Sequence, residues 1–167
     1  IVNIKYKVFN PLNNFMSKDD IISVVENFKL SNNTFFPLPI YLDIDSFSLK
    51  KIIKSDYLKL YFNKLRVCNL SVFSIFELAS KKKLGSKIFN TTDQFHPGYK
   101  NFLESKKYFV EGKIENFNNR ILKTISFSNP QDVISKIKKL GLKNVAAFHT
   151  RNVPHKGHEW IHNYVLK

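Results

Sequence analysis

The residues best suited to chemistry gather near the end of the chain. Four of its five histidines fall between positions 149 and 162, in the densest polar cluster of the sequence. Arg151 offers a planar fork of donors that suits a tetrahedral oxyanion, and Asn152 adds an amide in the same turn. This combination of residue types indicates a site for phosphate or a related anion.

His155 and His158 lie three residues apart, so both are expected to project from one side of the first turn of a helix. A helix N-terminus favours phosphate, because its backbone N–H groups are free and its dipole is positive there. Gly157 lacks a Cβ, which allows a nucleotide to approach the backbone closely. A lone histidine would more often cap or pack, but His-x-Gly-His after an Arg-Asn loop favours binding.

An overlapping motif would support different chemistry. Residues 158–162 fit H-E-x-x-H, in which His158 and His162 would bind zinc one helical turn apart and Glu159 would be the general base. The pattern is short and arises easily by chance, and helix-surface or packing roles explain Glu159 and His162 equally well. The zinc metalloenzyme is therefore the lesser alternative, and no residue is assigned as a metal ligand.

Two helices and a strand are predicted to position this cluster. Asn129 and Pro130 are typical of a helix cap and first position, and Gly141 of the residue after a helix end. Residues 145–148 are apolar without polar alternation and predict a fully buried strand, and a second helix is expected to begin near His155. The predicted buried face of the first helix is Val133, Ile134, Ile137 and Leu140.

Helix, strand, loop and helix in this order are typical of an α/β unit. Ligands of such units bind at the carboxyl ends of the strands. The binding edge is therefore predicted at residues 149–158.

The chain before residue 126 predicts a small, mostly β domain with one or two helices. Ser17 is a good N-cap for a helix with an apolar face over residues 21–28. A strand is expected in residues 36–44, with its prolines at its start. Tyr57–Phe62 and 66–73 flank a two-residue turn and predict a hairpin, and 108–114 predict a further strand.

The formal net charge of +14 raises the question of a nucleic-acid partner. Lys, Asn, Ile and Phe are all abundant, however, and the lysines are scattered, with one run at Lys81-Lys82-Lys83 that we expect to be a solvated face. The aromatic residues lie mostly on apolar stripes, whereas an RNA site would place them on an exposed basic sheet. Nucleic acid is therefore the less favoured partner.

The single cysteine, Cys68, excludes an internal disulfide framework and is expected to be a small core residue. No apolar run reaches the roughly 18–20 residues of a membrane span, so no membrane partner is expected and a reducing cytoplasm is the expected compartment. The chain opens on Ile1, and its last seven residues resemble a helix interior. We therefore expect a fragment of a longer protein.

Four segments resemble the ATP sulfurylase (sulfate adenylyltransferase) family, in matching order and spacing over nearly the whole chain. Residues 147–159 (AFHTRNVPHKGHE) are similar to its substrate loop, where F-Q-T-R-N-P-x-H-x-x-H-E is typical. Residues 9–16 (FNPLNNFM) resemble its opening segment and residues 36–43 (FPLPIYLD) its proline-x-proline-isoleucine strand. Residues 92–98 (TDQFHPG) resemble its threonine-aspartate…histidine-proline element.

The resemblance implies an α+β chain, with a PUA-like β-rich N-terminal domain at residues 1–128 and the opening of a Rossmann-like α/β nucleotidyltransferase domain at 129–167. It implies transfer of the adenylyl group from ATP to sulfate, which gives adenosine 5′-phosphosulfate and pyrophosphate and requires Mg²⁺. The full-length protein is expected to be a homo-oligomer. By resemblance, His149 and Arg151 would hold sulfate. The nucleotide phosphates would be held by Asn152, His155 and His158, and the catalytic residues would be Arg151, His155 and His158.

Two departures from the family pattern lie in this loop. The usual glutamine is His149, which can donate a hydrogen bond but is sensitive to pH, and the usual proline is displaced to give Val153-Pro154. The family's glycine-arginine-aspartate nucleotide loop would lie beyond Lys167, so this chain alone is not expected to catalyse the reaction. The alternative of another class is a PUA-like RNA-binding module, although a fold by itself does not entail that function.

Overall fold

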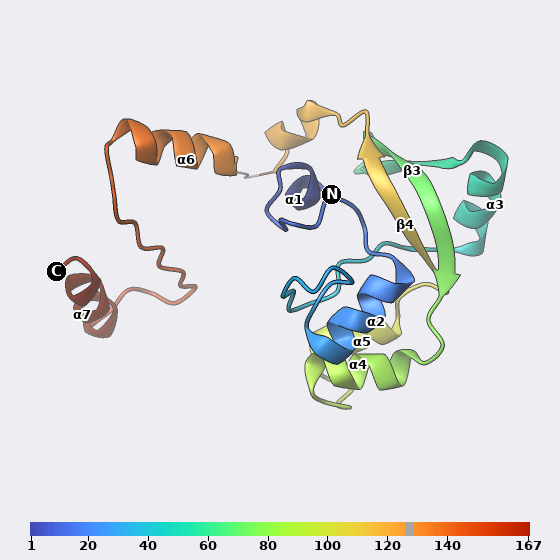
Figure 1. Cartoon of the computed structure of the whole chain (residues 1–167), viewed down its shortest axis with the longest axis horizontal. Helices are drawn as coiled ribbons and strands as arrows, with labels where there is room; N and C mark the ends of the chain where they lie inside the picture. The colour runs from blue at the N-terminus through green and yellow to red at the C-terminus, as the bar shows by residue number, and fades with distance from the viewer. Residues whose placement is uncertain (126–128) are drawn as a thin grey trace. The chain divides into compact units, whose positions relative to one another are not determined.

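The computed structural model describes residues 1–125 and 129–167. The chain divides into two compact units, Ile1–Phe127 and Ser128–Lys167 (Figure 1). The last three residues of the predicted N-terminal domain, 126–128, lie outside the described residues. The predicted domain boundary between residues 128 and 129 therefore stays a prediction.

The first unit contains an antiparallel four-stranded sheet in the order β1-β4-β3-β2. The central pair is β3 (Leu65–Glu77) and β4 (Tyr108–Glu115), and the edges are β1 (Asp43–Ile44) and β2 (Tyr57–Phe62). The long β3 pairs with β2 through its first half and with β4 through its second half (Figure 1). The strand predicted at residues 108–114 is confirmed.

The predicted hairpin is also confirmed. Phe62 pairs with Leu65, and the two residues between them, Asn63 and Lys64, have φ angles of 47° and 65°. Positive φ at both central residues is the mark of a tight turn whose twist matches that of the strands. The turn therefore sets the register of β2 against β3.

The pairing of β3 with β4 depends on a glycine. The register shifts between Val72 and Ser74, which leaves Phe73 without a partner across the ladder, and Val72 is opposite Gly112. A Cβ at Gly112 would lie 2.5 Å from the backbone oxygen of Ser71. The backbones approach at this point more closely than any side chain would allow.

More helices form in this unit than the one or two predicted, so that prediction and the description "mostly β" are wrong. Those described are α1 (Val2–Lys5), α2 (Lys18–Asn27), α3 (Ser46–Ser55), α4 (Lys81–Phe89), α5 (Pro97–Leu103) and the 3₁₀ helix η1 (Asn119–Lys123). The predicted N-cap of α2 is confirmed, because the Ser17 hydroxyl accepts from Asp20 N at 3.1 Å. Asp45, Ser80 and His96 cap α3, α4 and α5 in the same way.

The strand predicted in residues 36–44 is wrong except at its end, where Asp43–Ile44 form β1. Pro37 and Pro39 have no N–H to donate to a ladder. Ile40 instead accepts from Met16 N at 3.1 Å, and Leu42 accepts from Val110 N at 3.0 Å. The segment is therefore held by scattered backbone bonds and forms no continuous strand.

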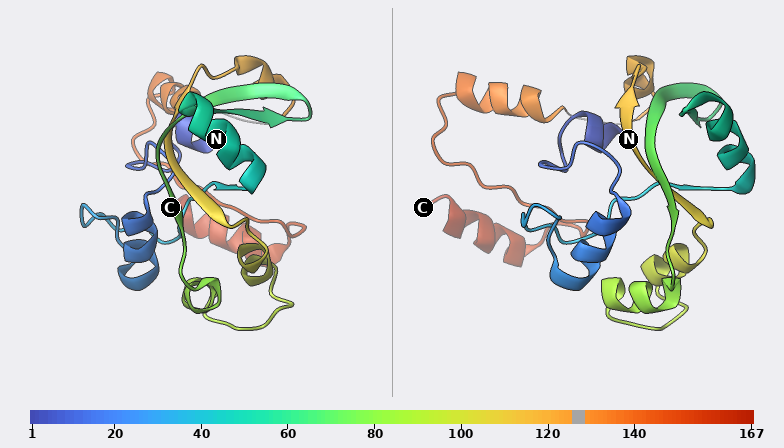
Figure 2. Two further views of the ribbon diagram at one scale, coloured as in Figure 1. Left: turned by 90° about the vertical axis from the view of Figure 1, so that its right-hand side faces the viewer. Right: turned by 45° about the vertical axis from the view of Figure 1, so that its right-hand side comes forward.

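The sheet separates two apolar clusters. Side chains alternate along a strand, so Phe109 packs into the cluster around α2 and Val110 into the cluster that includes Ile52 of α3. Helices α4 and α5 pack against each other, and α4 packs against α2 (Figure 2).

Cys68 is fully buried with Val67 and Ile121, and burial raises the pKa of its thiol. These contacts confirm the prediction that Cys68 is a core residue.

The lysine run at the start of α4 is only partly the solvated face that was predicted. Lys82 and Lys83 are exposed, whereas Lys81 is half-buried and donates from Nζ to the backbone oxygens of Ser105 and Lys106. Burial lowers the pKa of Lys81. This lysine therefore ties α4 to the chain before β4 and is a structural residue.

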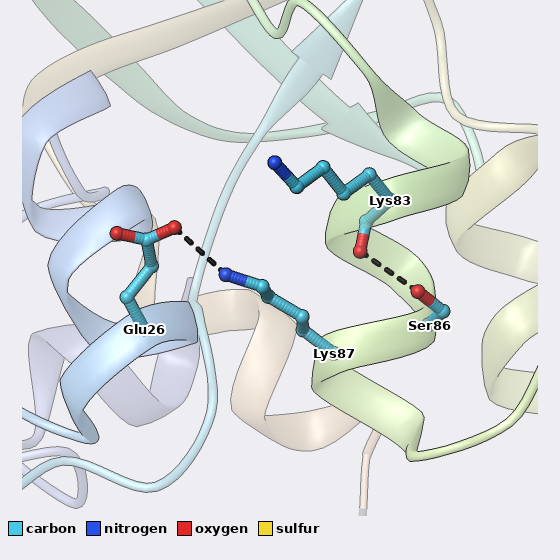
Figure 3. Close-up of polar contacts among 4 residues, drawn as sticks. All are labelled: Glu26, Lys83, Ser86 and Lys87. Atoms are coloured by element: carbon cyan, nitrogen blue, oxygen red, sulfur yellow. Dashed lines mark hydrogen bonds and ion pairs between the residues drawn. The ribbon is translucent and has the colours of Figure 1, made fainter.

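The opposite end of α4 is joined to α2 by an ion pair. Lys87 Nζ lies 2.9 Å from Glu26 Oε1, and Ser86 donates to the Lys83 backbone oxygen at 2.9 Å (Figure 3). The pKa of Glu26 is lowered by the hydrogen bond and charge of Lys87, with a smaller effect of Lys83. Both partners are exposed, so this pair contributes little to stability.

Gly112→Ala is expected to destabilise the first unit by roughly 2 kcal/mol, because overpacking against a backbone atom cannot be relieved by a rotamer change. Urea unfolding followed by circular dichroism measures the change. Lys113→Ala, at the exposed neighbouring position of β4, is the control and should be nearly neutral. An unchanged unfolding midpoint in Gly112→Ala would show that the close approach is not needed.

Candidate functional site

The first helix of the second unit begins and ends as predicted. In α6 (Pro130–Lys139) the Asn129 side chain accepts from Gln131 N at 3.0 Å. Gly141 has a φ of 67°, and its N–H donates to Lys138 O at 3.0 Å. The cap at Asn129 and the glycine after the helix end are confirmed, since both depend only on local backbone geometry.

The apolar face predicted to be buried on α6 is exposed. Val133, Ile134 and Leu140 are 47%, 42% and 61% exposed, and Ile137 is half-buried. Neither α6 nor α7 (Lys156–Val165) contains a buried residue. Residues 145–148 form no strand, and the exposed fraction of Phe148 is 43%. Both predictions are wrong for this chain, because a buried strand requires neighbouring strands and the described part of this unit supplies none.

The two histidines of the predicted site form the N-terminus of α7, as predicted. His155 is the N-cap, and its Nδ1 accepts from Gly157 N at 3.1 Å. Reciprocally, His158 Nδ1 accepts from His155 N at 3.1 Å, which completes a capping box. The two imidazole rings lie 4.0 Å apart between centroids.

This arrangement fixes the tautomer of both rings. A neutral imidazole has one acceptor nitrogen and one donor nitrogen, and each Nδ1 here is the acceptor of a backbone N–H. The proton of each neutral ring must then be on Nε2. The N-terminus of α7 therefore offers two imidazole N–H donors next to the positive end of the helix dipole.

Gly157 has a role that the sequence did not indicate. A Cβ at this position would lie 3.0 Å from Cε1 and 3.2 Å from Nδ1 of His155. The glycine therefore makes room for the His155 ring that caps the helix. The predicted close approach of a nucleotide to this backbone is a separate requirement that stays a prediction.

Sequence reasoning missed Phe148 and Thr150. The Phe148 ring meets the rings of His162 and His158 edge to face, at 4.6 Å and 5.4 Å between centroids. Thr150 Oγ1 accepts from Asn152 N at 3.0 Å and so folds the loop. Phe148 matches the first position of the F-Q-T-R-N pattern, and the i, i+4 spacing of the two histidines, which makes one helical face, was a second signal.

The remaining predicted site residues lie in the loop before α7. His149, Arg151 and Asn152 are exposed, and Arg151 makes no hydrogen bond or ion pair within the described ranges. An open hollow of about 480 Å³ on α7 is lined by His155 and His158 but not by Arg151 or Asn152. The chain thus brings the two histidines together, and the roles of His149, Arg151 and Asn152 stay predictions.

No group of three or more His, Cys, Asp or Glu side chains in the described parts of the chain is placed to hold a metal ion. Glu159 and His162 of the H-E-x-x-H motif line the hollow on α7 beside His158.

No helix in residues 1–125 or 129–167 has the length and apolar character needed to cross a membrane.

Two protein families match the two parts of the chain. The PUA-like domain family matches residues 1–119. The ATP-sulfurylase family matches residues 126–167, which include the capping histidines and the loop before them.

Curated relatives match the chain along nearly its whole length. A sulfate adenylyltransferase from Hyperthermus butylicus is 31% identical over 167 residues, which cover 99% of this chain and 43% of that protein. Those from Thermococcus onnurineus and Entamoeba histolytica are 32% and 33% identical, covering 98% and 92% of this chain and 42% and 38% of those proteins. The chain therefore spans less than half the length of these relatives.

A solved structure shares the fold at low sequence identity. A hexameric APS kinase from Thiobacillus denitrificans matches with a TM-score of 0.66 and 14% identity, over 98% of this chain and 29% of that one. At this identity the likeness supports the fold alone.

Two variants of His155 distinguish its role as the N-cap of α7 from the presence of its imidazole ring. His155→Ala is expected to speed amide exchange in the first turn of α7 roughly fivefold, because an N-cap contributes about 1 kcal/mol. His155→Asn should restore slow exchange, since asparagine is a strong N-cap. Hydrogen exchange of residues 156–159 by NMR measures both. Equal exchange in the parent and both variants would mean that His155 does not hold the helix end.

Proposed function

Because the chain belongs to the PUA-like domain family over residues 1–119 and matches the ATP-sulfurylase family over residues 126–167, we propose that it is part of a sulfate adenylyltransferase. The reaction joins ATP and sulfate to give adenosine 5′-phosphosulfate and pyrophosphate. A sulfate oxygen attacks the α-phosphorus of ATP, a new P–O bond forms, and the bond to the bridging oxygen breaks. Pyrophosphate leaves with the electron pair.

One observation carries this proposal: the N-terminus of α7 presents two imidazole N–H donors in the segment that matches the family. Sulfate is a weak nucleophile, so an enzyme for this reaction must chiefly position two anions and neutralise charge at the α-phosphate. Fixed donors at a helix N-terminus meet that requirement, because they need no reorganisation when the anion arrives.

We assign the residues of the loop and helix to two anions. Arg151, whose guanidinium has no partner in the described structure, would bind sulfate with His149. Asn152, His155 and His158 would bind the phosphates of ATP. Arg151, His155 and His158 would stabilise charge in the transition state.

Mg²⁺ is part of the proposal as a companion of the nucleotide. The loop and the start of α7 offer mainly donors to anion oxygens, whereas Mg²⁺ prefers oxygen ligands and commonly binds through substrate phosphates. The described residues fit the phosphate end of such a complex, and the ion would neutralise phosphate charge there. No group of protein side chains is assigned to bind Mg²⁺ directly.

The uncovered apolar faces support a Rossmann-like completion of the second unit. Val133, Ile134 and Leu140 on α6 and Trp160 on α7 are exposed, and the matched relatives are more than twice as long as this chain. A parallel sheet in the longer protein would cover these faces and give residues 145–148 the partners that a buried strand needs. A cytoplasmic location and a homo-oligomeric state complete the proposal.

Arg151→Ala in a protein that spans the full length of the relatives is expected to lower sulfate-dependent pyrophosphate release on the order of 10²-fold or more, as when one preorganised donor is removed from an oxyanion site. Steady-state release of pyrophosphate from ATP measures it. Lys82→Gln and Lys83→Gln, at exposed positions of α4, are controls that should leave turnover nearly intact. Lys81 is unsuitable as a control because it bonds two backbone oxygens.

Full turnover in Arg151→Ala would contradict the role assigned to this loop. His155→Asn refines the test, since it keeps an N-cap and removes the imidazole. The proposal expects this variant to lose activity as well, or to raise the ATP requirement.

A further inference from the structure

A second hollow lies in the first unit, between helix α3 and the edge strand β2. Its volume is about 460 Å³, and it is open to solvent. α3 contacts β2 and lies beside the sheet in both views of Figure 2. Phe47, Lys51 and Lys54 line the hollow from α3, where their i, i+4, i+7 spacing places them on one helical face. One wall is therefore a helix face, and the other is the outer strand of a sheet.

The outer edge of β2 is free. β2 is the last strand in the order β1-β4-β3-β2, and no described strand lies beyond it. Within residues 1–125 and 129–167, one hydrogen bond joins the backbone of Tyr57–Phe62 to a partner other than β3, from the Ser55 hydroxyl to the Tyr57 oxygen at 3.1 Å. An edge of this kind presents a row of N–H and C=O groups to which another chain can pair.

Positive charge surrounds this free edge. Lys51, Lys54 and Lys59 line the hollow, no carboxylate lines it, and none of these lysines forms an ion pair within the described ranges. Complementary charge between two surfaces speeds their encounter and disfavours the wrong partners. The hollow therefore favours an anionic partner.

Exposed aromatic rings accompany the lysines. Phe47, Tyr57 and Tyr61 are 66%, 41% and 60% exposed, and all three line the hollow. Lys51 Nζ lies 4.3 Å from the centroid of the Phe47 ring, and Lys59 Nζ lies 5.9 Å from that of Tyr57. Aromatic side chains pair favourably with β-branched side chains on a neighbouring strand. The rings thus offer apolar contacts to the same partner that the lysines attract.

We propose that this hollow binds an extended, acidic segment of a partner protein, which adds to the sheet as a strand beside β2. Strand addition draws its affinity from main-chain hydrogen bonds and its specificity from alternate side chains. A segment of alternating acidic and β-branched residues would place carboxylates near the lysines and apolar groups near the rings. The hollow shares no lining residue with the hollow on α7, so this binding is separate from the proposed anion site.

A second copy of this chain and a nucleic acid each fit the hollow less well. Residues 57–62 include no Asp or Glu, so two copies paired edge to edge would bring lysines together, and like charges on paired strands are destabilising. A nucleic acid would neutralise the lysines, but it has no peptide backbone with which to continue the ladder. The free edge therefore favours an acidic peptide.

Fluorescence anisotropy of the full chain with a labelled eight-residue peptide of alternating glutamate and valine tests the proposal. Successive residues of a strand direct their N–H groups to opposite sides, so only the glutamate or only the valine N–H groups can bond to β2. N-methylation of that set is expected to weaken binding more than tenfold, because each backbone hydrogen bond contributes about fivefold. N-methylation of the other set keeps the same side chains and charges, and that control peptide should bind like the parent peptide.

Charge reversal in the protein provides a second readout. Lys51→Glu and Lys54→Glu are each expected to weaken binding of the unmethylated peptide by roughly threefold or more, because an exposed ion pair is lost and a repulsion replaces it. Lys82→Glu, at an exposed position of α4, changes the net charge equally and should bind like the parent.

Four results would overturn the proposal. Equal affinity for the parent peptide and both N-methylated peptides would show that no ladder forms. Equal weakening by Lys51→Glu and Lys82→Glu would show that binding is diffuse. Full competition by an equimolar ten-nucleotide oligouridylate would identify a nucleic-acid site, and a dimer of the free chain that dissociates when the peptide is added would identify a second copy as the occupant.

Discussion

The first unit depends on the close contact between β3 and β4 at Gly112. Because no side chain separates the backbones there, β4 can follow β3 past the register shift at Val72 and Ser74. Phe15 N donates to the oxygen of Gly112 at 3.4 Å, which attaches the segment before α2 to the same point. Beyond it, alternate residues of β4 enter the two clusters, so the packing on both faces of the sheet follows from this pairing.

The second unit is held by different forces. Its helices bury no residue, so they depend on caps at Asn129, Gly141 and His155. At α7 the cap and the proposed phosphate donors are the same imidazoles, which use Nδ1 for the backbone and leave Nε2–H as a donor. The residues proposed to bind phosphate are therefore positioned by the helix end they cap, without support from a core.

Features that depend on neighbouring residues alone were predictable from the sequence. The N-caps at Ser17 and Asn129, the turn at Asn63-Lys64 and the start of α7 near His155 each follow from a few adjacent side chains. The helices α3, α4 and α5 were missed although their N-caps at Asp45, Ser80 and His96 are local signals of the same kind. The lack of a strand at residues 145–148 depends on distant residues and was not predictable. Periodicity shows which residues are apolar, but the partner that covers them is set by packing between segments.

The proposed function requires residues 149–158 to hold the two anions of an adenylyl transfer. The most direct measurement is a crystal structure of the protein at the full length of its relatives, with adenosine 5′-phosphosulfate bound. We expect the sulfate oxygens to accept from the guanidinium of Arg151, and the α-phosphate to lie at the N-terminus of α7, within hydrogen-bond distance of His155 or His158 Nε2. A product molecule bound without contact to residues 149–158 would contradict it.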